Sequence, residues 1–105
     1  MNPNDEEIKE VDAAQARQMI RQEDVIIIDI RSGLDYESGN IEGARHLTPD
    51  TFEEFLETTD KSKTVLCYCY FGNSSLGVCA ALKEHGFANP VSLKGGFSAW
   101  QQNQE

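Results

Sequence analysis

Cys69 stands where an apolar run of residues gives way to a polar segment that contains glycine. The run over residues 64–69 is typical of a buried strand, and a helix is expected to start at Ser74 or Ser75. A loop between these elements can turn its backbone N–H groups and the N-terminus of the helix toward the cysteine sulfur. Such surroundings lower the pKa of a thiol. The spacing therefore indicates a nucleophilic thiolate at Cys69, although a cysteine at a strand end can also be a small packing residue.

Cys67 and Cys79 complete a set of three cysteines. A disulfide between Cys67 and Cys69 would be strained, because the two residues are i and i+2 on one extended strand. A metal site would need more ligands, and only His46, His85 and Cys79 remain, all distant in the sequence. We therefore expect no metal site and interpret Cys67 and Cys79 as buried packing residues. A resolving role for Cys67 is the alternative.

The elements that would position Cys69 alternate between strand-like and helix-like patterns. Strands are predicted over residues 25–30, 44–47, 64–69 and 90–93, and helices after Asp12, at Thr48-Pro49, from Ser74 or Ser75 to His85, and after Gly95-Gly96. This alternation predicts an α/β fold with a central parallel sheet of about five short strands and helices on both faces. Reactive groups gather at the carboxyl ends of the strands in such sheets, so the loops after Ile30 and Tyr68 matter most.

Length and charge limit the classes of function. The chain has 105 residues, of which 39% are hydrophobic, and this favours a single domain over residues 1–105. Nine basic residues against 18 acidic ones give a formal charge of −9, which disfavours binding to nucleic acid or to an anionic membrane surface. The segment from Met1 to Glu7 is acidic and has no apolar stretch, so no signal peptide is expected and a cytoplasmic location is predicted.

Three motifs, in order along nearly the whole chain, resemble those of one family. The segment Cys69-Tyr70-Phe71-Gly72-Asn73-Ser74-Ser75 resembles the active-site loop of the rhodaneses, or thiosulfate sulfurtransferases. Residues 29–31 and 35–44 are similar to the family's upstream motif, and residues 95–100 to its closing Gly-Gly-aromatic-x-x-Trp segment. The chain is therefore identified as a member of the single-domain rhodanese family. The resemblance implies a rhodanese-like fold and chemistry without a cofactor.

Sulfur transfer is the activity that the resemblance implies. The Cys69 thiolate would take sulfane sulfur from thiosulfate or another persulfide-type donor and pass it to cyanide or a thiol, with a thioredoxin-like protein as one candidate acceptor. The amides of residues 70–75 would hold the charge of the Cys69 persulfide. The hydroxyls of Ser74 and Ser75 either add hydrogen bonds to the sulfur or cap the helix. The alternative is a non-catalytic persulfide carrier or partner-binding module.

Asp29 and Arg31 are the further candidate site residues, in the loop after the first buried strand. Arg31 could contact an anionic donor, but a structural ion pair with Asp35, four residues later, is the favoured interpretation. Asp29 is expected to accept hydrogen bonds from the loop, because an ionised thiol needs no general base.

The chain also departs from the family pattern. Many members carry a basic residue in the active-site loop, whereas Tyr70, Phe71 and Asn73 are uncharged, and Asn40 stands where histidine is common. Because a charge of −9 also repels anions, we expect thiosulfate to bind weakly. A tyrosine-type phosphatase is disfavoured, because its Cys-x5-Arg motif would need arginine at the position of Ser75.

Overall fold

A parallel sheet forms the centre of the computed structural model, which describes residues 8–22 and 24–103. Its five strands are β1 (Lys9–Val11), β2 (Val25–Asp29), β3 (Arg45–His46), β4 (Thr64–Tyr68) and β5 (Asn89–Leu93). They lie in the order β1-β5-β4-β2-β3, and every neighbouring pair is parallel. The predicted α/β fold with a parallel sheet is confirmed. The prediction about a signal peptide concerns residues 1–7, which lie outside the described residues.

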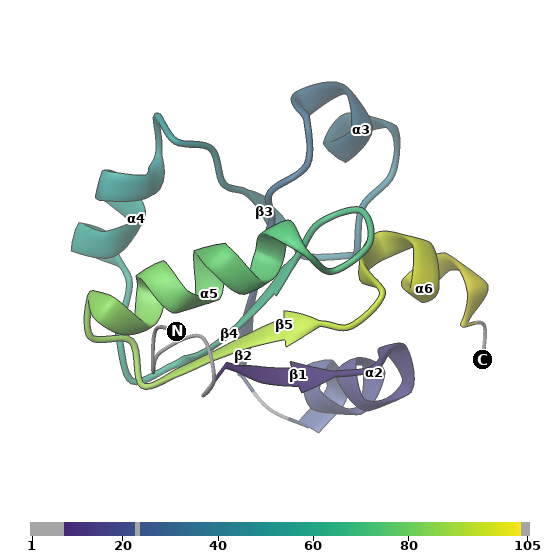
Figure 1. Cartoon of the computed structure of the whole chain (residues 1–105), viewed down its shortest axis with the longest axis horizontal. Helices are drawn as coiled ribbons and strands as arrows, with labels where there is room; N and C mark the ends of the chain where they lie inside the picture. The colour runs from purple at the N-terminus through teal and green to yellow at the C-terminus, as the bar shows by residue number, and fades with distance from the viewer. Residues whose placement is uncertain (1–7, 23, 104–105) are drawn as a thin grey trace.

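Helices cover both faces of the sheet (Figure 1). They are α2 (Ala13–Gln22), α3 (Gly33–Ser38), α4 (Phe52–Thr58), α5 (Ser74–Glu84) and α6 (Gly96–Gln102). Alternate strand residues point to opposite faces, so Ile27 and Leu66 join the core on the α2 and α6 side. Ile28 and Cys67 join the core under α4 and α5. Burial on both faces explains why the strands appear in the sequence as continuous apolar runs.

The starts of two helices test the sequence predictions. At α2 the N–H of Gln15 donates to Asp12 Oδ1 over 2.8 Å, and the N–H of Asp12 donates to Gln15 Oε1 over 3.0 Å, which confirms the predicted cap. The helix predicted at Thr48-Pro49 begins only at Phe52. The reason is a turn, in which the N–H of Thr48 donates to Thr51 Oγ1 over 3.0 Å and the N–H of Thr51 donates to the Thr48 carbonyl over 3.1 Å.

Two short elements were not predicted. β1 has three residues at the edge of the sheet, two of them exposed, so it has almost no apolar pattern. α3 has six residues, none of them buried, inside the segment that we expected to be a loop. Ser32 caps α3 by accepting a hydrogen bond from the N–H of Asp35 over 3.2 Å. Such short elements depend on local caps and tertiary contacts more than on hydrophobic periodicity.

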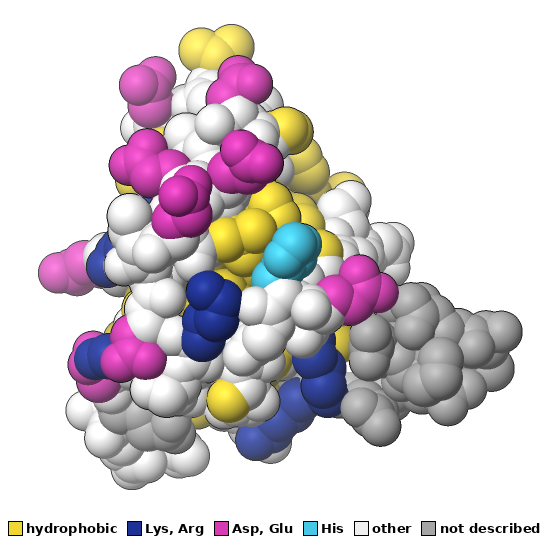
Figure 2. Space-filling view, turned by 90° about the vertical axis from the view of Figure 1, so that its left-hand side faces the viewer, with side chains coloured by type: hydrophobic (Ala, Val, Ile, Leu, Met, Phe, Trp, Pro, Cys, Tyr) yellow, Lys and Arg dark blue, Asp and Glu magenta, His cyan; other side chains and the backbone are white. Residues whose placement is uncertain are grey.

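The face of the molecule that carries α4 combines carboxylates with apolar side chains. Figure 2 shows Asp and Glu side chains gathered on the upper part of this face, with apolar side chains and a histidine below them. This cluster reflects the composition of the chain, which has 18 acidic and nine basic residues. Within residues 8–22 and 24–103, no helix is long and apolar enough to cross a membrane.

Candidate active site

Cys69 lies directly after β4, and the loop that leads to α5 turns around its sulfur. The N–H of Gly72 donates to Cys69 Sγ over 3.2 Å, and the N–H of Ser75 donates over 3.4 Å. The hydroxyl oxygen of Ser75 also lies 3.4 Å from Sγ. The first turn of α5 and the middle of the loop therefore both direct donors at one sulfur atom.

The electrostatic result is a lowered pKa for the Cys69 thiol. Burial alone would raise this pKa, but hydrogen bonds from the Ser75 hydroxyl and from the amides of Ser75, Gly72 and Phe71 outweigh burial and lower it. By contrast, burial and the hydrogen bond with Cys79 raise the pKa of Cys67 well above its usual value. The two cysteines of one strand end therefore differ sharply in thiolate character.

The loop owes its shape to contact with the start of α6. The N–H groups of Phe97 and Ser98 donate to the carbonyls of Cys69 and Tyr70 over 2.9 and 3.1 Å. Gly96 has φ +60°, and a Cβ atom there would lie 2.5 Å from the Tyr70 carbonyl oxygen. Only glycine permits this approach without a shift of the backbone. The closing Gly-Gly segment thus fixes two carbonyls of the loop, while the amides that follow face the sulfur.

The other loop side chains lie away from Sγ. Tyr70 and Phe71 are 41% and 70% exposed. Asn73 and Ser74 are also exposed, and neither is a hydrogen-bond partner of Sγ in the described part of the chain. Ser74 is the first residue of α5, so of the two serines only Ser75 adds a hydroxyl contact to the sulfur.

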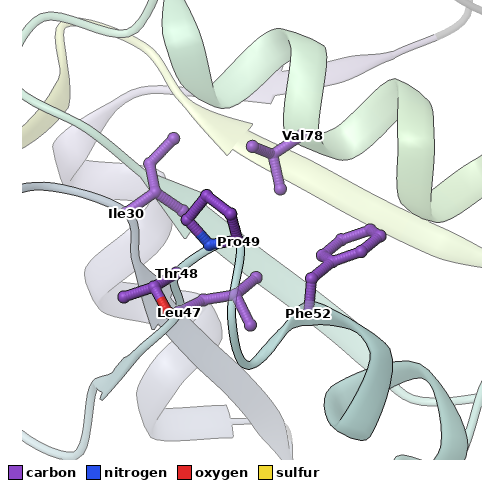
Figure 3. Close-up of a pocket in the computed structure, with 6 residues that line it drawn as sticks. All are labelled: Ile30, Leu47, Thr48, Pro49, Phe52 and Val78. Carbon is purple, nitrogen blue, oxygen red and sulfur yellow. The ribbon is translucent and has the colours of Figure 1, made fainter.

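The surface has two main hollows, of which one adjoins the cysteine loop. An apolar hollow of about 460 Å³ lies between α4 and α5 and is lined by Ile30, Leu47, Thr48, Pro49, Phe52 and Val78 (Figure 3). The other, of about 400 Å³, adjoins the loop directly and is lined by Arg31, Asp35, Ser38, Gly39, Tyr70, Phe71, Phe97, Ser98 and Gln101. The second hollow is the candidate approach for substrates, because two residues of the cysteine loop form its wall.

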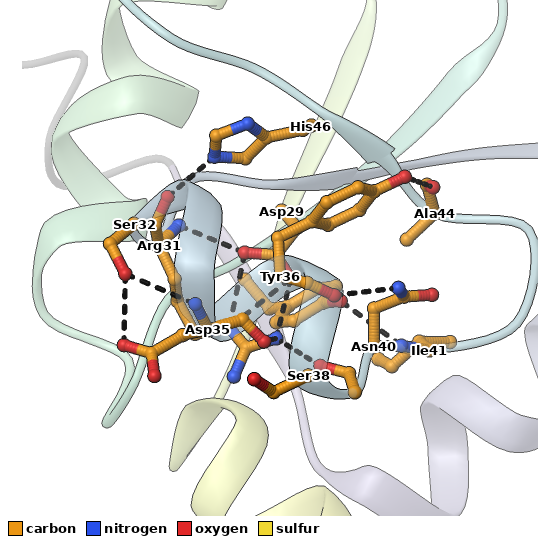
Figure 4. Close-up of polar contacts among 12 residues, drawn as sticks. Asp29, Arg31, Ser32, Asp35, Tyr36, Ser38, Asn40, Ile41, Ala44 and His46 are labelled. Atoms are coloured by element: carbon orange, nitrogen blue, oxygen red, sulfur yellow. Dashed lines mark hydrogen bonds and ion pairs between the residues drawn. The ribbon is translucent and has the colours of Figure 1, made fainter.

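Arg31 pairs with Asp29, and the predicted ion pair with the Asp35 carboxylate was wrong (Figure 4). Arg31 Nη2 lies 2.8 Å from Asp29 Oδ2 and donates to the Gly39 carbonyl over 2.6 Å. The backbone N–H of Arg31 donates to Asp29 Oδ1 over 2.8 Å, so Asp29 accepts loop hydrogen bonds as predicted. Arg31 pairs with Asp29 and not with Asp35 because the Asp29 carboxylate is fully buried and needs a cation beside it.

The exposed carboxylate of Asp35 instead connects α3 to the cysteine loop. It accepts hydrogen bonds from the hydroxyls of Tyr70 and Ser32, and both lower the pKa of Asp35. The N–H of Ser32 also donates to the Tyr70 hydroxyl over 3.3 Å. Tyr70, the residue after the cysteine, thereby holds the loop against the start of α3.

Three further polar groups can now be placed. Ser92, which the sequence analysis did not single out, is fully buried on β5 with its Oγ 2.8 Å from Ser75 Oγ. Its one signal in the sequence is a lone hydroxyl within the apolar strand predicted over residues 90–93. His46 Nε2 lies 2.6 Å from the Arg31 carbonyl, and Asn40 donates to the Tyr36 carbonyl over 2.8 Å.

Among the residues that the structure describes, no group of three or more His, Cys, Asp or Glu side chains could hold a metal ion.

Known proteins resemble this chain along almost its full length. The family model described as Rhodanese-like domain matches residues 12–103. Thiosulfate sulfurtransferase GlpE of Coxiella burnetii is 39% identical over 93 residues, which cover 89% of this chain and 87% of that protein. Thiosulfate sulfurtransferase GlpE of Glaesserella parasuis is 34% identical over 100 residues, which cover 95% of this chain and 93% of that protein.

Solved structures agree in fold. A crystal structure of a rhodanese-like domain protein from Staphylococcus aureus matches with a TM-score of 0.79 at 24% identity, over 89% of this chain and 91% of that one. A solution NMR structure of a rhodanese-like domain from Anabaena matches with a TM-score of 0.81 at 24% identity, over 97% of this chain and 75% of that one. With a family match over residues 12–103 and relatives up to 39% identical, the chain belongs to the rhodanese-like domain family.

Proposed function

We propose that Cys69 is the nucleophile through which this rhodanese-family sulfurtransferase carries sulfane sulfur from a donor to an acceptor. The observation that supports the proposal is the set of polar groups around one sulfur: the amides of Gly72 and Ser75 donate to it over 3.2 and 3.4 Å, and the Ser75 hydroxyl, which can donate to a thiolate, lies 3.4 Å away. These fixed dipoles stabilise negative charge without a general base. A cysteine with a lowered pKa at the end of a parallel strand is suited to covalent catalysis.

In the first half-reaction the Cys69 thiolate attacks the outer sulfur of the donor. With thiosulfate, an S–S bond forms between Cys69 Sγ and that sulfur while the bond to the sulfite sulfur breaks. Sulfite leaves with the electron pair, and the enzyme holds an anionic persulfide. The amides that surround Cys69 would stabilise the negative charge of this persulfide.

In the second half-reaction a nucleophilic acceptor attacks the outer sulfur of the persulfide. The new bond joins the acceptor to that sulfur, the S–S bond to Cys69 breaks, and the electron pair returns to Sγ as the thiolate. Cyanide would give thiocyanate, and a thiolate would give a new persulfide. A thioredoxin-like protein is one thiol acceptor that would fit this scheme, because the loop residue Phe71 is 70% exposed and the hollow beside it is open to a large partner.

Local charge at the site favours a persulfide donor over thiosulfate. Thiosulfate sulfurtransferase is the name of the relatives at 34–39% identity. In this chain, however, the Arg31 guanidinium is bound to Asp29, and the other charged group in the hollow is the Asp35 carboxylate. A dianion approaching Cys69 therefore meets no unpaired cation among the residues that line this hollow.

Intact mass spectrometry tests the proposal. The protein is incubated with thiosulfate or with a small-molecule persulfide, measured, and measured again after cyanide is added. We expect a gain of one sulfur atom that cyanide removes and that the Cys69→Ala variant does not show. Failure of every donor to load the wild-type protein, or loading of Cys69→Ala, would overturn the proposal. A protein that loads sulfur once but does not release it to cyanide or thiols would instead be the non-catalytic carrier.

A further inference from the structure

Ser92 is a buried hydroxyl on the face of the sheet that supports the cysteine loop. It pairs with Cys67 in the register between β4 and β5, and its side chain is fully buried. Its neighbours Val91 and Leu93 point to the opposite core, under α2 and α6. Ser92 therefore places a strong hydrogen-bonding group inside a layer of mostly apolar side chains.

The Ser92 hydroxyl is joined to the cysteine through a second buried serine. Ser92 Oγ lies 2.8 Å from Ser75 Oγ, and Ser75 Oγ lies 3.4 Å from Cys69 Sγ. Ser75, like Ser92, is fully buried. In the described part of the chain, Ser75 is the hydrogen-bond partner of the Ser92 side chain. The three side chains form a hydrogen-bonded chain that runs from β5 through the first turn of α5 to the reactive sulfur.

When Cys69 is a thiolate, the number of protons on the two serine hydroxyls determines which group donates each hydrogen bond. Each hydroxyl has one proton, and a thiolate can only accept. As a neutral thiol, Cys69 donates a hydrogen bond to Ser75 Oγ. As a thiolate it accepts one from the Ser75 hydroxyl, and the Ser75 oxygen is then left to accept a hydrogen bond from Ser92. A hydrogen bond received by Ser75 strengthens the one it donates, because neighbouring hydrogen bonds polarise one another in a medium of low dielectric constant.

We propose that Ser92 is a positioning residue for sulfur transfer: by donating to Ser75 it holds the Ser75 hydroxyl as a donor to the Cys69 thiolate. This inference rests on the proposed role of Cys69 as the nucleophile. The thiolate occurs twice in each cycle, as the attacking group and as the leaving group when the acceptor takes the outer sulfur. A leaving thiolate of lower pKa departs faster. The hydrogen bonds from Ser92 to Ser75 and from Ser75 to Cys69 therefore assist the second half-reaction in particular.

Few other groups near the sulfur titrate. Cys67, on β4 two residues before Cys69, interacts with Cys69, but burial raises the pKa of Cys67 so that it stays a neutral thiol. Asp29 interacts with Cys67 and is neutralised by its ion pair with Arg31. Of the groups that lower the pKa of Cys69, the Ser75 hydroxyl is the largest, ahead of the loop amides. A change in that hydroxyl should therefore appear directly in the titration of Cys69.

The test is the pH dependence of alkylation of Cys69 by iodoacetamide, with the modified residue located by peptide mass spectrometry. We expect Ser75→Ala to raise the pKa of Cys69 by about one unit and Ser92→Ala by about half a unit, as loss of a hydrogen bond to a charged group implies. In Ser75→Ala/Ser92→Ala the shift should equal that of Ser75→Ala alone, because Ser92 acts through Ser75. With thiols as acceptors, Ser92→Ala should lower kcat and leave kcat/KM for the donor nearly unchanged, because the slowed step is the second half-reaction.

Three variants separate positioning from packing. Ser92→Thr keeps the hydroxyl and should keep the pKa of wild type, whereas Ser92→Cys keeps the size, offers only a weak donor and should raise the pKa. Val91→Ala, next to Ser92 but facing the other core, should lower the urea midpoint without moving the pKa. An unshifted pKa of Cys69 in Ser92→Ala or Ser92→Cys would overturn the inference. So would a Ser92→Ala substitution that raises the pKa of Cys69 by the same amount in the Ser75→Ala background as in the wild-type protein. Alkylation needs no turnover, so its result stands apart from sulfur loading, on which the proposed function depends.

Discussion

Fixed dipoles, and not a neighbouring base, lower the pKa of Cys69. The groups that lower this pKa are the Ser75 hydroxyl and the amides of Ser75, Gly72 and Phe71, none of which gains or loses a proton near neutral pH. A thiolate held in this way depends on the geometry of the loop and not on the protonation of a histidine. Its reactivity should therefore follow a single titration, that of the sulfur itself.

The first prediction concerns the pH at which Cys69 becomes reactive. The folded pKa is lowered, so the rate of alkylation should rise with pH and level off at a lower pH than in the chain unfolded by urea. The stability that the shift contributes is present above the unfolded pKa and is lost as the pH falls through the folded pKa. Stopped-flow alkylation of native and unfolded protein measures both midpoints. Equal midpoints in the two states would contradict the prediction.

A second prediction at the same scale concerns the neighbouring cysteine. Cys67 is fully buried beside Cys79 under α5, and its pKa is raised, so it has no thiolate character to contribute. Cys67→Ala should keep sulfur transfer within about twofold of wild type and cost about 1 kcal/mol in the free energy of unfolding. Steady-state kinetics and urea unfolding measure the two effects, with Cys79→Ala as the matched control. Loss of turnover in Cys67→Ala alone would indicate a resolving role instead.

At the scale of elements, the cysteine loop is shaped as much by α6 as by the strand and helix that it connects. The N-terminal amides of α6 bind the carbonyls of Cys69 and Tyr70, and Gly96 allows this contact. On the other side, Tyr70 binds Asp35 of α3. Segments far apart in sequence thus hold the loop from two sides, while β4 and α5 only set its ends.

Substitution of glycine tests the contact with α6. Gly96→Ala would place a Cβ atom 2.5 Å from the Tyr70 carbonyl at φ +60°, so the loop must shift. We expect a loss of about 1–3 kcal/mol in stability, a fall in kcat/KM of at least about tenfold and a rise in the pKa of Cys69. Gly77→Ala is the matched control: nothing lies within 4 Å of its Cβ position on α5, so it should stabilise by about 0.5–1 kcal/mol and leave turnover unchanged. A fully active Gly96→Ala would show that the contact does not shape the loop.

Elements with a strong local pattern were predicted from the sequence, and those that depend on tertiary contacts were not. The apolar runs of β2 and β4 and the capped start of α2 carry their own signals, as does the cysteine between β4 and α5. β1 is defined only by its pairing with β5, and α3 only by caps and the polar contacts around Arg31. Ser92 and the choice of Asp29 as the partner of Arg31 also depend on neighbours across the fold, so spacing along the chain could not reveal them.

At the scale of the whole molecule, the net charge affects which sulfur donor reaches the site. It does not affect how the Cys69 thiolate reacts with that donor. The formal charge of −9 creates a negative field around the site, and Figure 2 shows carboxylates gathered on the face that carries α4. The loop itself has no charged side chain from Tyr70 to Ser75. Steering of an anion must therefore come from outside the loop, where acidic residues outnumber basic ones by 18 to nine.

Ionic strength gives the last prediction. Because protein and thiosulfate are both negative, added salt should screen their repulsion and raise kcat/KM for thiosulfate about two- to fivefold between low salt and about 0.1 M, where the Debye length is about 10 Å. Alkylation of Cys69 by uncharged iodoacetamide should not change over the same range. Asp35→Asn removes the carboxylate of the hollow and should raise the low-salt rate for thiosulfate while reducing its salt dependence. If salt instead slows the reaction with thiosulfate, the local field of Arg31 outweighs the net charge, and thiosulfate rather than a persulfide is the donor that the site favours.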